Sequence, residues 1–459
     1  MSTPETPAEW LPILTKQIDN GRPRITALRR YVDGDAPMPE MSRNTRAAWQ
    51  QFQRKSRTNW GELIVEAVAD RIIPIGIEVA GSTESDEAKA AQRIWRDNRM
   101  DVAFKKLIRD GLAYRDSYLI VGIDDDAQAV ITAESPAYVT AATDPIRPWV
   151  VRAAIKVWRD PVAKTDYAYV WIRGGRQRFE RPATRLGKLI ARAESASWVV
   201  SGEFEQISGD IPIYPYENPS GYGEFERHTD LIDRINHGLL QRLVITAMQA
   251  FRQRALRRKR PADGVPFDDD DSEGNDPDWS VVFEHAPGAL WDLPEDMDIW
   301  ESAITDVTQH LSAHKSDLRD LAAVTRTSLP MLIPDGANQS AAGAGELGAG
   351  MYLKAADRLQ AVQIALAAAL VKAMRVEGIE PSGTVRVLFE APERVSLTEK
   401  YAAAGQARAA GESWESIQRN ILGRTPDQIA RDAEARAREA TPAAAEAPPG
   451  GLNLPQEGT

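Results

Sequence analysis

The chain has 459 residues, a formal net charge of −11 at pH 7 and no cysteine. The length allows about two to four domains with real cores. The charge excludes a protein that coats nucleic acid through bulk charge, and the lack of cysteine excludes disulfides, thiolate metal sites and cysteine nucleophiles, as is typical of the cytoplasm.

The sequence carries no evident membrane signal. Residues Met1–Glu5 lack a basic region followed by an apolar core, so we expect no signal peptide. The most apolar stretch, Ile364 to Val371, is too short to span a bilayer. We therefore expect no membrane partner.

Apolar residues at helical spacing predict the N-terminal elements. The predicted helices cover residues 10–32, 43–73, 87–98 and 102–113. Asn59 is a candidate helix cap, and Pro74 ends the pattern that follows it.

From residue 117 the apolar period changes to two, which predicts strands. They cover residues 117–123, 129–132, 150–158, 167–173, 176–180 and 197–201. Gly174 and Gly175 join two of them in a predicted hairpin, so an antiparallel or mixed sheet is favoured. The Pro- and Gly-rich segment Ile211–Gly223 follows as an extended linker.

Two long predicted helices flank an acidic excursion. The first runs from about Glu226 to Arg258, with acids at its start and arginines at its end, as the helix macrodipole favours. The second has a narrow apolar seam, made of Ile304, Val307, Leu311, His314, Leu318 and Leu321. Between Pro261 and Glu301 stand fourteen Asp or Glu residues and no Lys or Arg. Like charges in such numbers resist burial, so the excursion is interpreted as a projection that contacts other molecules, or as a solvated acidic loop.

The charges at this boundary supply two groups of candidate contact residues. The basic cluster consists of Arg257, Arg258, Lys259 and Arg260. It allows three interpretations: pairing with the acidic run within or between subunits, a solvated helix end, or contact with nucleic acid. The acidic run includes Asp268, Asp269, Asp270 and Asp271.

The C-terminal part is predicted to be helical. A loop rich in Gly, Ala, Asn and Ser runs to about Gly350, and an Ala-rich helix follows over Met351–Val376. Further helices are predicted at residues 398–410, 413–422 and 426–440. Thr425 begins a capping box for the last of them. Residues 441–459 are rich in Pro, Ala and Gly and are expected to be disordered.

Several motifs resemble functional sites without completing them. Gly343–Gly348 fits a dinucleotide-binding pattern, but no strand is predicted to run into it. Asp269–Gly274 begins like a calcium loop, yet Ser280 stands where a bidentate Glu is required. His310 and His314 have the spacing of a zinc pair but no third ligand. No phosphate-binding loop or nucleophile elbow is present. We therefore expect no catalytic, cofactor-binding or metal-binding residues.

The ordered set of elements resembles the portal proteins of tailed double-stranded-DNA bacteriophages, in particular those of siphophages of Gram-positive and actinobacterial hosts. The resemblance rests on the extended segment Ile211–Asn218, a Gly/Ser turn, and Asp230–Asn236 opening a long helix. It continues in Ser396–Gly411, Ser413–Gly423 and Thr425–Ala430, and covers roughly residues 10–440.

This resemblance implies an α+β, mainly helical subunit of a ring, with roughly twelve copies at one vertex of the capsid. Double-stranded DNA would pass through the channel, and the large terminase and then the head-to-tail connector would dock on the ring. The major capsid and scaffolding proteins are further implied partners, and the location is the virion after assembly in the host cytoplasm. The implied parts are a wing (residues 1–225 and 351–395), a stem (226–260 and 302–325), a clip (261–301), a tunnel loop (326–350), a crown (396–440) and a tail (441–459).

The resemblance also gives the candidate residues their roles. Asn338, Gln339 and Ser340 become channel residues, since they offer hydrogen bonds to DNA without fixing a charge. The four aspartates become clip contacts for partners, and the basic cluster marks the boundary of stem and clip. Two alternatives remain: a helical scaffold or adaptor without a channel, and a capsid-associated hydrolase, for which the sequence shows no converging set of acids, histidine or serine.

Overall fold

A computed structural model describes residues 4–38, 46–183, 198–250, 254–258, 297–301, 306–334, 341–393, 397–424 and 426–445. The chain divides into two compact units. Unit 1 contains residues 1–37, 58–233 and 318–459, and unit 2 contains residues 38–57 and 234–317. The described elements confirm the predicted α+β class, with helices in the majority and antiparallel sheets.

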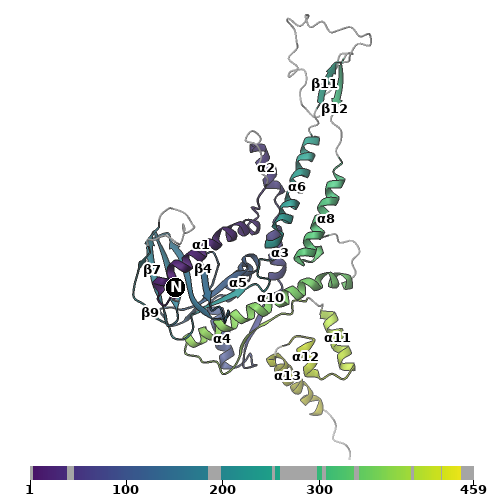
Figure 1. Ribbon diagram of the computed structural model, residues 1–459. Coiled ribbons are helices and arrows are strands. Elements are labelled where there is room, and N and C mark those ends of the chain that lie inside the picture. Colours follow the sequence, from purple (N-terminus) through teal and green to yellow (C-terminus); the bar gives the residue numbers. More distant parts are fainter. Residues whose placement is uncertain are drawn as a thin grey trace, which may run out of the picture. The chain divides into compact units, whose positions relative to one another are not determined.

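The N-terminal helices follow the predicted order (Figure 1). They are α1 (Pro7–Val32), α2 (Arg46–Ser56), α3 (Trp60–Ala69), α4 (Asp86–Asp97) and α5 (Met100–Tyr114). The prediction of one helix over residues 43–73 is wrong, because the chain breaks between α2 and α3. The break lies at Asn59, whose Oδ1 accepts a hydrogen bond from the Glu62 N–H at 3.3 Å. Asn59 is therefore the cap that the sequence predicted, but it starts a new helix.

The larger sheet of unit 1 is antiparallel and has the order β4-β5-β6-β7-β8, with β9 paired to β7. Its strands are β4 (Val139–Thr143), β5 (Val151–Asp160), β6 (Thr165–Ile172), β7 (Gly175–Pro182), β8 (Val199–Val200) and β9 (Glu205–Gln206). Helix α1 lies along one face of this sheet, as Figure 1 shows. Trp10, Leu14 and Ile18 of α1 pack there against Ile155 and Val170. The strand alternation supplies the apolar face that α1 covers.

The β6–β7 hairpin differs from its prediction by one position. Ile172 pairs with Gly175, so the two-residue turn is Arg173–Gly174 and not Gly174–Gly175. Gly174 has φ +94°, a conformation that favours glycine. Gly175 is needed for another reason, because a Cβ there would lie 2.4 Å from the carbonyl oxygen of Glu205.

A second sheet of unit 1 contains the segment that the sequence analysis treated as a linker. Its order is β10-β2-β3, with β2 (Asp116–Ile123), β3 (Ala129–Glu134) and β10 (Ile213–Glu217). Pro215 lies in β10, an edge strand, where a residue without an N–H is tolerated. A separate pair joins β1 (Pro74–Val79) to β13 (Val385–Phe389).

Helix α10 (Ala341–Val376) packs against β10, β2, β3 and β13 (Figure 1). It begins ten residues before the predicted Met351, so the assignment of residues 326–350 to one loop is wrong. The short helix α9 (Leu329–Leu332) also lies within that range. The Gly343–Gly348 motif forms part of α10, because propagating an Ala-rich helix outweighs a cost of about 1 kcal/mol for each glycine. One 18-residue window within Gly348–Val376 has a mean hydropathy of 1.4, so by length and composition alone α10 could cross a membrane, although a helix packed in the core of a protein meets the same criterion.

The C-terminal helices agree with their predictions. They are α11 (Leu397–Ala409), α12 (Trp414–Asn420) and α13 (Pro426–Ala445). The Ser413 side chain caps α12 by accepting a hydrogen bond from the Ser416 N–H at 3.2 Å. Within the predicted disordered tail, residues 441–445 belong to α13, and residues 446–459 lie outside the described range.

Unit 2 contains α2, most of α6 (Thr229–Ala250), β11 (Arg254–Arg258), β12 (Met297–Glu301) and the first part of α8 (Thr308–Thr325). The prediction of one helix from Glu226 to Arg258 is wrong at both ends. A 3-10 turn occupies Glu226–His228, and Arg254–Arg258 is a strand paired with β12. Pairing between segments about forty residues apart prevails here over the local helix preference of Arg, Ala and Leu.

The second long helix also starts later than predicted. Helix α8 begins at Thr308, whose N–H donates to Asp306 Oδ1 at 2.8 Å, while residues 302–305 lie outside the described range. Within unit 2, Arg234 of α6 forms an ion pair with Asp317 of α8 at 2.8 Å. The two long helices of the sequence prediction therefore exist, but each is shorter.

Candidate functional site

The structure tests few of the residues that the sequence nominated. Asn338, Gln339 and Ser340 lie outside the described residues, as do Lys259, Arg260 and the four aspartates at 268–271. Arg257 and Arg258 lie in β11. The interpretation of the basic cluster as a helix end is therefore wrong for these two residues.

The β11–β12 register describes the backbone of part of the basic cluster. Arg257 is paired with Asp298, and Arg254 is paired with Glu301. The other two interpretations of the cluster, pairing with acidic residues and contact with nucleic acid, stay predictions.

A buried polar cluster of unit 1 lies at the C-terminal end of α8, next to the predicted tunnel loop. The Thr325 hydroxyl donates to the Leu321 carbonyl at 2.6 Å and lies 2.9 Å from the Thr327 hydroxyl. Between them Arg326 has φ +51°, a conformation uncommon for a residue with a side chain. The Lys354 ammonium of α10 donates to the Thr325 carbonyl at 2.7 Å. Helix α10 thus holds the point at which α8 ends.

The same lysine belongs to a buried charge cluster. Lys354 Nζ lies 3.2 Å from Glu224 Oε2, and Arg358 Nε donates to Glu224 Oε1 at 2.8 Å. The side chains of Lys354, Arg358 and Glu224 are 5%, 8% and 4% exposed. Asn218 Nδ2 donates to Glu224 Oε1 at 2.9 Å, and the Glu224 N–H donates to the carbonyl of Leu112 at 2.8 Å. Glu224 therefore contacts α10 through its carboxylate and α5 through its backbone N–H, and it joins both helices to the segment that leads into α6.

Burial and the neighbouring charges shift the pKa values of Glu224 and Lys354 in opposite directions. Burial alone would raise the pKa of the Glu224 carboxyl, but Lys354 and Arg358 outweigh it and leave that pKa below its ordinary value. Burial lowers the pKa of the Lys354 ammonium against the opposing effect of Glu224. The carboxylate is thus held in its ionised form by two cations, which is what a buried charge requires.

The start of α6 is fastened to α1 within the same unit. Arg24 donates to both carboxylate oxygens of Glu226, through Nε at 2.6 Å and through Nη2. Arg24 Nη1 also donates to the Tyr114 carbonyl at 3.1 Å. Further along, the Tyr31 hydroxyl donates to the Asp233 carboxylate at 2.9 Å. The first turns of α6 are therefore held by charged and polar contacts at two points.

Sequence reasoning missed these fastening residues. Lys354 and Arg358 are one helical turn apart in a helix that is otherwise rich in Ala, Leu and Val. Two cations at that spacing on the apolar side of a helix indicate that an acidic residue from elsewhere in the fold forms a buried ion pair with them. Their partner Glu224 could not be named, because it lies 130 residues before Lys354, directly after the segment that was interpreted as a linker.

The arrangement links backbone segments of unit 1 through buried polar contacts. Its polar groups are saturated by one another, and they join the ends of α6 and α8 to the rest of unit 1. Among the described residues, no group of three or more His, Asp or Glu side chains could hold a metal ion. The site is therefore a structural junction at the base of two long helices.

The comparisons with known proteins identify the family. Residues 13–443 match the family described as "Phage portal protein, SPP1 Gp6-like". Among solved structures, a chain in the "Virion of native gene transfer agent (GTA) particle" is 15% identical, with a TM-score of 0.47 and coverage of 88% of this chain and 98% of that chain. A chain in the "Neck of empty GTA particle computed with C6 symmetry" is 15% identical, with a TM-score of 0.46 and coverage of 87% and 99%. No curated protein sequence matches the chain.

Proposed function

The chain belongs to the SPP1 Gp6-like family of phage portal proteins, and on this basis we propose that it forms the ring through which double-stranded DNA enters and leaves the capsid. The family match over residues 13–443 carries this proposal. The ring would contain roughly twelve copies around a closed cyclic axis. This is a structural function of the virion, and it agrees with a junction that carries no reactive groups.

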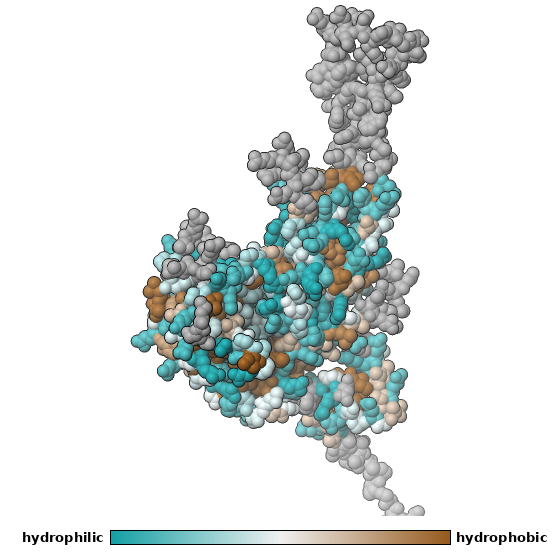
Figure 2. All heavy atoms as spheres, viewed as in Figure 1, coloured by the Kyte–Doolittle hydropathy of each residue, from teal (hydrophilic) through white to brown (hydrophobic). Residues whose placement is uncertain are grey.

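The long helices offer surfaces that a ring neighbour would cover. On α6, Leu243, Val244 and Ile245 are only half-buried, and Leu311 of α8 is 43% exposed. Figure 2 shows apolar side chains on the surface of the part that contains α6 and α8. A subunit in a ring buries such residues against the next copy, whereas a monomer leaves them in water.

We propose boundaries for these parts that follow the observed helices and strands. The stem would consist of α6 and α8, and the clip would begin at β11 and end at β12, enclosing residues 259–296. The tunnel loop would be limited to the segment between α9 and α10, which contains Asn338, Gln339 and Ser340. The first half of the chain together with α10 and β13 would form the wing, and α11 to α13 would form the crown.

We assign partners by the same reasoning. The acidic clip would receive the large terminase during packaging and the head-to-tail connector afterwards, and the outer surface would meet the capsid and scaffolding proteins. A net charge of −11 also suits a DNA conduit. Each fixed contact between a cation and a phosphate adds affinity, and therefore resistance to sliding. Assembly would take place in the host cytoplasm before the protein becomes part of the virion.

Mass measurement and negative-stain images of the purified full-length chain test this function. We expect a ring with a central hole and a mass near about twelve times 50.7 kDa. A monomer or dimer with hydrolytic activity would instead support a capsid-associated hydrolase. An elongated oligomer of low order without a hole would support a scaffold or adaptor. Either of these results overturns the proposal.

A further inference from the structure

The loop between β4 and β5, residues 144–150, presents two large apolar side chains to solvent. Ile146 is 87% exposed and Trp149 is 78% exposed. Single exposed apolar residues are ordinary on protein surfaces, but tryptophan is uncommon there. Here two such residues stand three positions apart in one short loop, so the loop deserves a specific explanation.

The loop is fixed in shape before any partner arrives. The Asp144 carboxylate accepts hydrogen bonds from the N–H groups of Ile146 at 2.9 Å and Arg147 at 3.0 Å. The Asp144 N–H donates to the Val150 carbonyl, and the Val150 N–H donates to the Arg147 carbonyl, both at 2.8 Å. Pro145 and Pro148 further restrict the backbone. A rigid loop loses little conformational entropy when its exposed side chains are covered.

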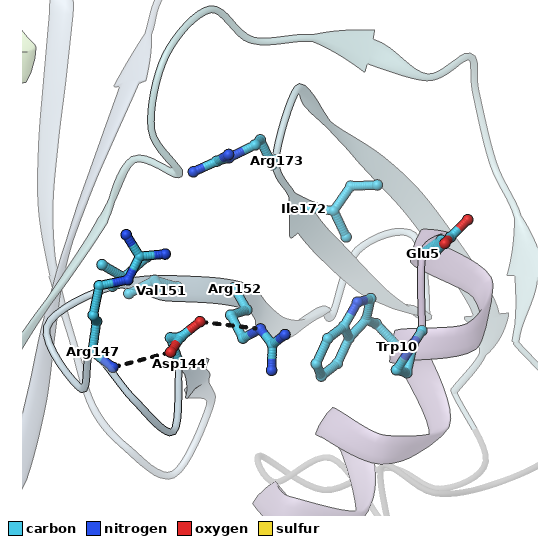
Figure 3. A pocket seen from close by; sticks show the side chains of 10 residues that line it. Glu5, Trp10, Asp144, Arg147, Val151, Arg152, Ile172 and Arg173 are labelled. Carbon is cyan, nitrogen blue, oxygen red and sulfur yellow. Dashed lines mark hydrogen bonds and ion pairs between the residues drawn. The ribbon is translucent and has the colours of Figure 1, made fainter. Parts of the chain in front are cut away.

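A pocket of about 280 Å³ lies beside this loop and is rich in arginine. Figure 3 shows Arg147, Arg152 and Arg173 arranged around it, with the Trp10 indole at its side. Arg152 Nε lies 3.8 Å from Asp144 Oδ2. The guanidinium groups of Arg147 and Arg173 form no hydrogen bond or ion pair with any described residue. Both residues are exposed, and the lining also contains the carboxyl groups of Glu5 and Asp144, so three arginines stand beside two acids at the edge of the exposed apolar pair.

We propose that loop 144–150 and this pocket form a docking surface for a partner polypeptide segment that carries acidic residues around an apolar anchor. The apolar anchor would pack on Ile146 and Trp149, and its carboxylates would reach Arg147 and Arg173. Trp and Arg are the residue types that dominate binding energy at protein interfaces. The cationic pocket on a chain of net charge −11 gives the surface a charge complementary to acidic partners.

The chemistry favours a polypeptide over double-stranded DNA. Sequence-independent contacts to DNA go mainly to phosphate and sugar, to which an exposed Ile146 offers no matching group. An isoleucine and a tryptophan at the tip of a rigid loop match an apolar side chain instead. A neighbouring copy of this chain is the remaining occupant, and the experiment below separates it.

The test uses the full-length protein and a short fluorescein-labelled peptide of alternating glutamate and leucine, followed by anisotropy. Two control peptides replace either every glutamate by glutamine or every leucine by serine. One double variant, Ile146→Ser with Trp149→Ser, removes the apolar pair. A second, Arg147→Glu with Arg173→Glu, reverses the free cations.

The chain offers a matched control for each change. Val162 is 90% exposed and lies in a turn that Asp160 caps in the same way, through the N–H groups of Val162 at 2.8 Å and Ala163 at 3.0 Å. Val162→Ser therefore controls for the loss of exposed apolar surface. Lys105→Glu, at an exposed position of α5, controls for charge reversal.

We expect the peptide to bind the wild type and both control variants alike, and to bind each double variant about tenfold or more weakly. Both control peptides should bind weakly to every form.

The proposal is overturned if the peptide does not bind the wild type or binds all variants equally. It is also overturned if the double variants bind a labelled DNA duplex less well, which would assign the surface to DNA. A changed mass distribution of the oligomer in the double variants would assign it to a subunit interface and likewise overturn it. Because peptide binding is read separately from ring formation, failure of this inference leaves the proposed function standing.

Discussion

Lys354 and Glu224 form a buried ion pair, with 3.2 Å between Nζ and Oε2 and side chains that are 5% and 4% exposed. Lys354 also donates to the carbonyl of Thr325, the last residue of α8. Arg358 shares the same carboxylate. Glu224 therefore pairs with two cations, of which Arg358 also pairs with the exposed Asp357, and it does so where a long helix ends.

The first prediction follows from the two cations that share Glu224. Glu224→Gln leaves the buried Lys354 without a counter-charge and leaves Arg358 only the exposed Asp357 as a partner, so we expect it to lower the free energy of unfolding by about 3–5 kcal/mol. Lys354→Met leaves Glu224 paired with Arg358 and should cost less, about 1–3 kcal/mol. Urea unfolding followed by circular dichroism measures both. Equal losses in the two variants would show that Glu224 does not hold the cluster together.

The second prediction concerns pH and Asp110 of α5. Burial raises the pKa of this carboxyl from 3.8 to about 6, against the opposing charge of Lys106. A raised pKa in the folded state means that the contribution of this carboxyl to stability is fully present below pH 3.8 and is lost as the pH rises through about 6. Asp110→Asn cannot ionise, so its stability relative to wild type should increase by about 1–2 kcal/mol between pH 4 and pH 7, allowing for partial solvent contact. Thermal unfolding at a series of pH values checks this. A constant difference across the series would contradict it.

The third prediction concerns the proposed stem. Leu243→Pro places a proline inside α6, and Leu311→Pro places one in the first turns of α8. Leu243→Pro should cost about 3 kcal/mol or more and prevent ring formation, because it removes a helical hydrogen bond and clashes with the preceding turn. Leu311→Pro should act less strongly, since it lies nearer the helix start. Negative-stain images and mass measurement read the outcome. Normal rings from Leu243→Pro would remove α6 from the stem.

The fourth prediction concerns the acidic run. Replacing Asp268–Asp271 by Asn should leave the free energy of unfolding nearly unchanged, because the sequence predicts that a run of like charges resists burial, and charges in solvent contribute little individually. It should weaken docking of the terminase or the connector, which pull-down of either protein by the assembled ring would measure. Replacing Asp124–Asp126, an exposed acidic turn of unit 1, by Asn gives a control that keeps docking intact. A lower free energy of unfolding in the Asp268–Asp271 variant, together with unchanged docking of both partners, would contradict this prediction.

The fifth prediction concerns the proposed tunnel loop. Deleting Asn338, Gln339 and Ser340 shortens the connection between α9 and α10 without entering either helix. Rings should still assemble, whereas DNA packaging or retention should fall, because the hydrogen-bonding side chains would be missing from the channel. Quantifying packaged DNA per particle tests this. Full packaging and infectivity would leave the segment as a plain linker.

Local signals were sufficient for most elements of the fold. The Asn59 cap, the β6–β7 hairpin and the Ser413 cap all depend on residues within a few positions of each other. Pairings between distant segments were not predictable in the same way. Strand β1 was read only as the end of a helix at Pro74, because its partner β13 lies more than 300 residues later. For the same reason β10 was read as a linker.

The candidate site was less accessible to sequence reasoning than the fold. The nominated residues Asn338 to Ser340 and Asp268 to Asp271 lie outside the described residues, so their roles remain predictions. Part of the buried cluster was visible in the sequence, as the two cations Lys354 and Arg358 of an apolar helix. A buried charge shows in the sequence, but its counter-charge depends on the tertiary fold.

Two ion pairs that differ in solvent exposure should respond differently to ionic strength. The Debye length falls to roughly 3 Å in 1 M salt, so exposed pairs are screened while buried pairs largely escape. Arg234 and Asp317, at 58% and 24% exposed, belong to the first kind, and Lys354 and Glu224 belong to the second. Concentrated counterions, such as those that accompany densely packed DNA, would therefore loosen the attraction between Arg234 and Asp317 while leaving the end of α8 fastened to α10.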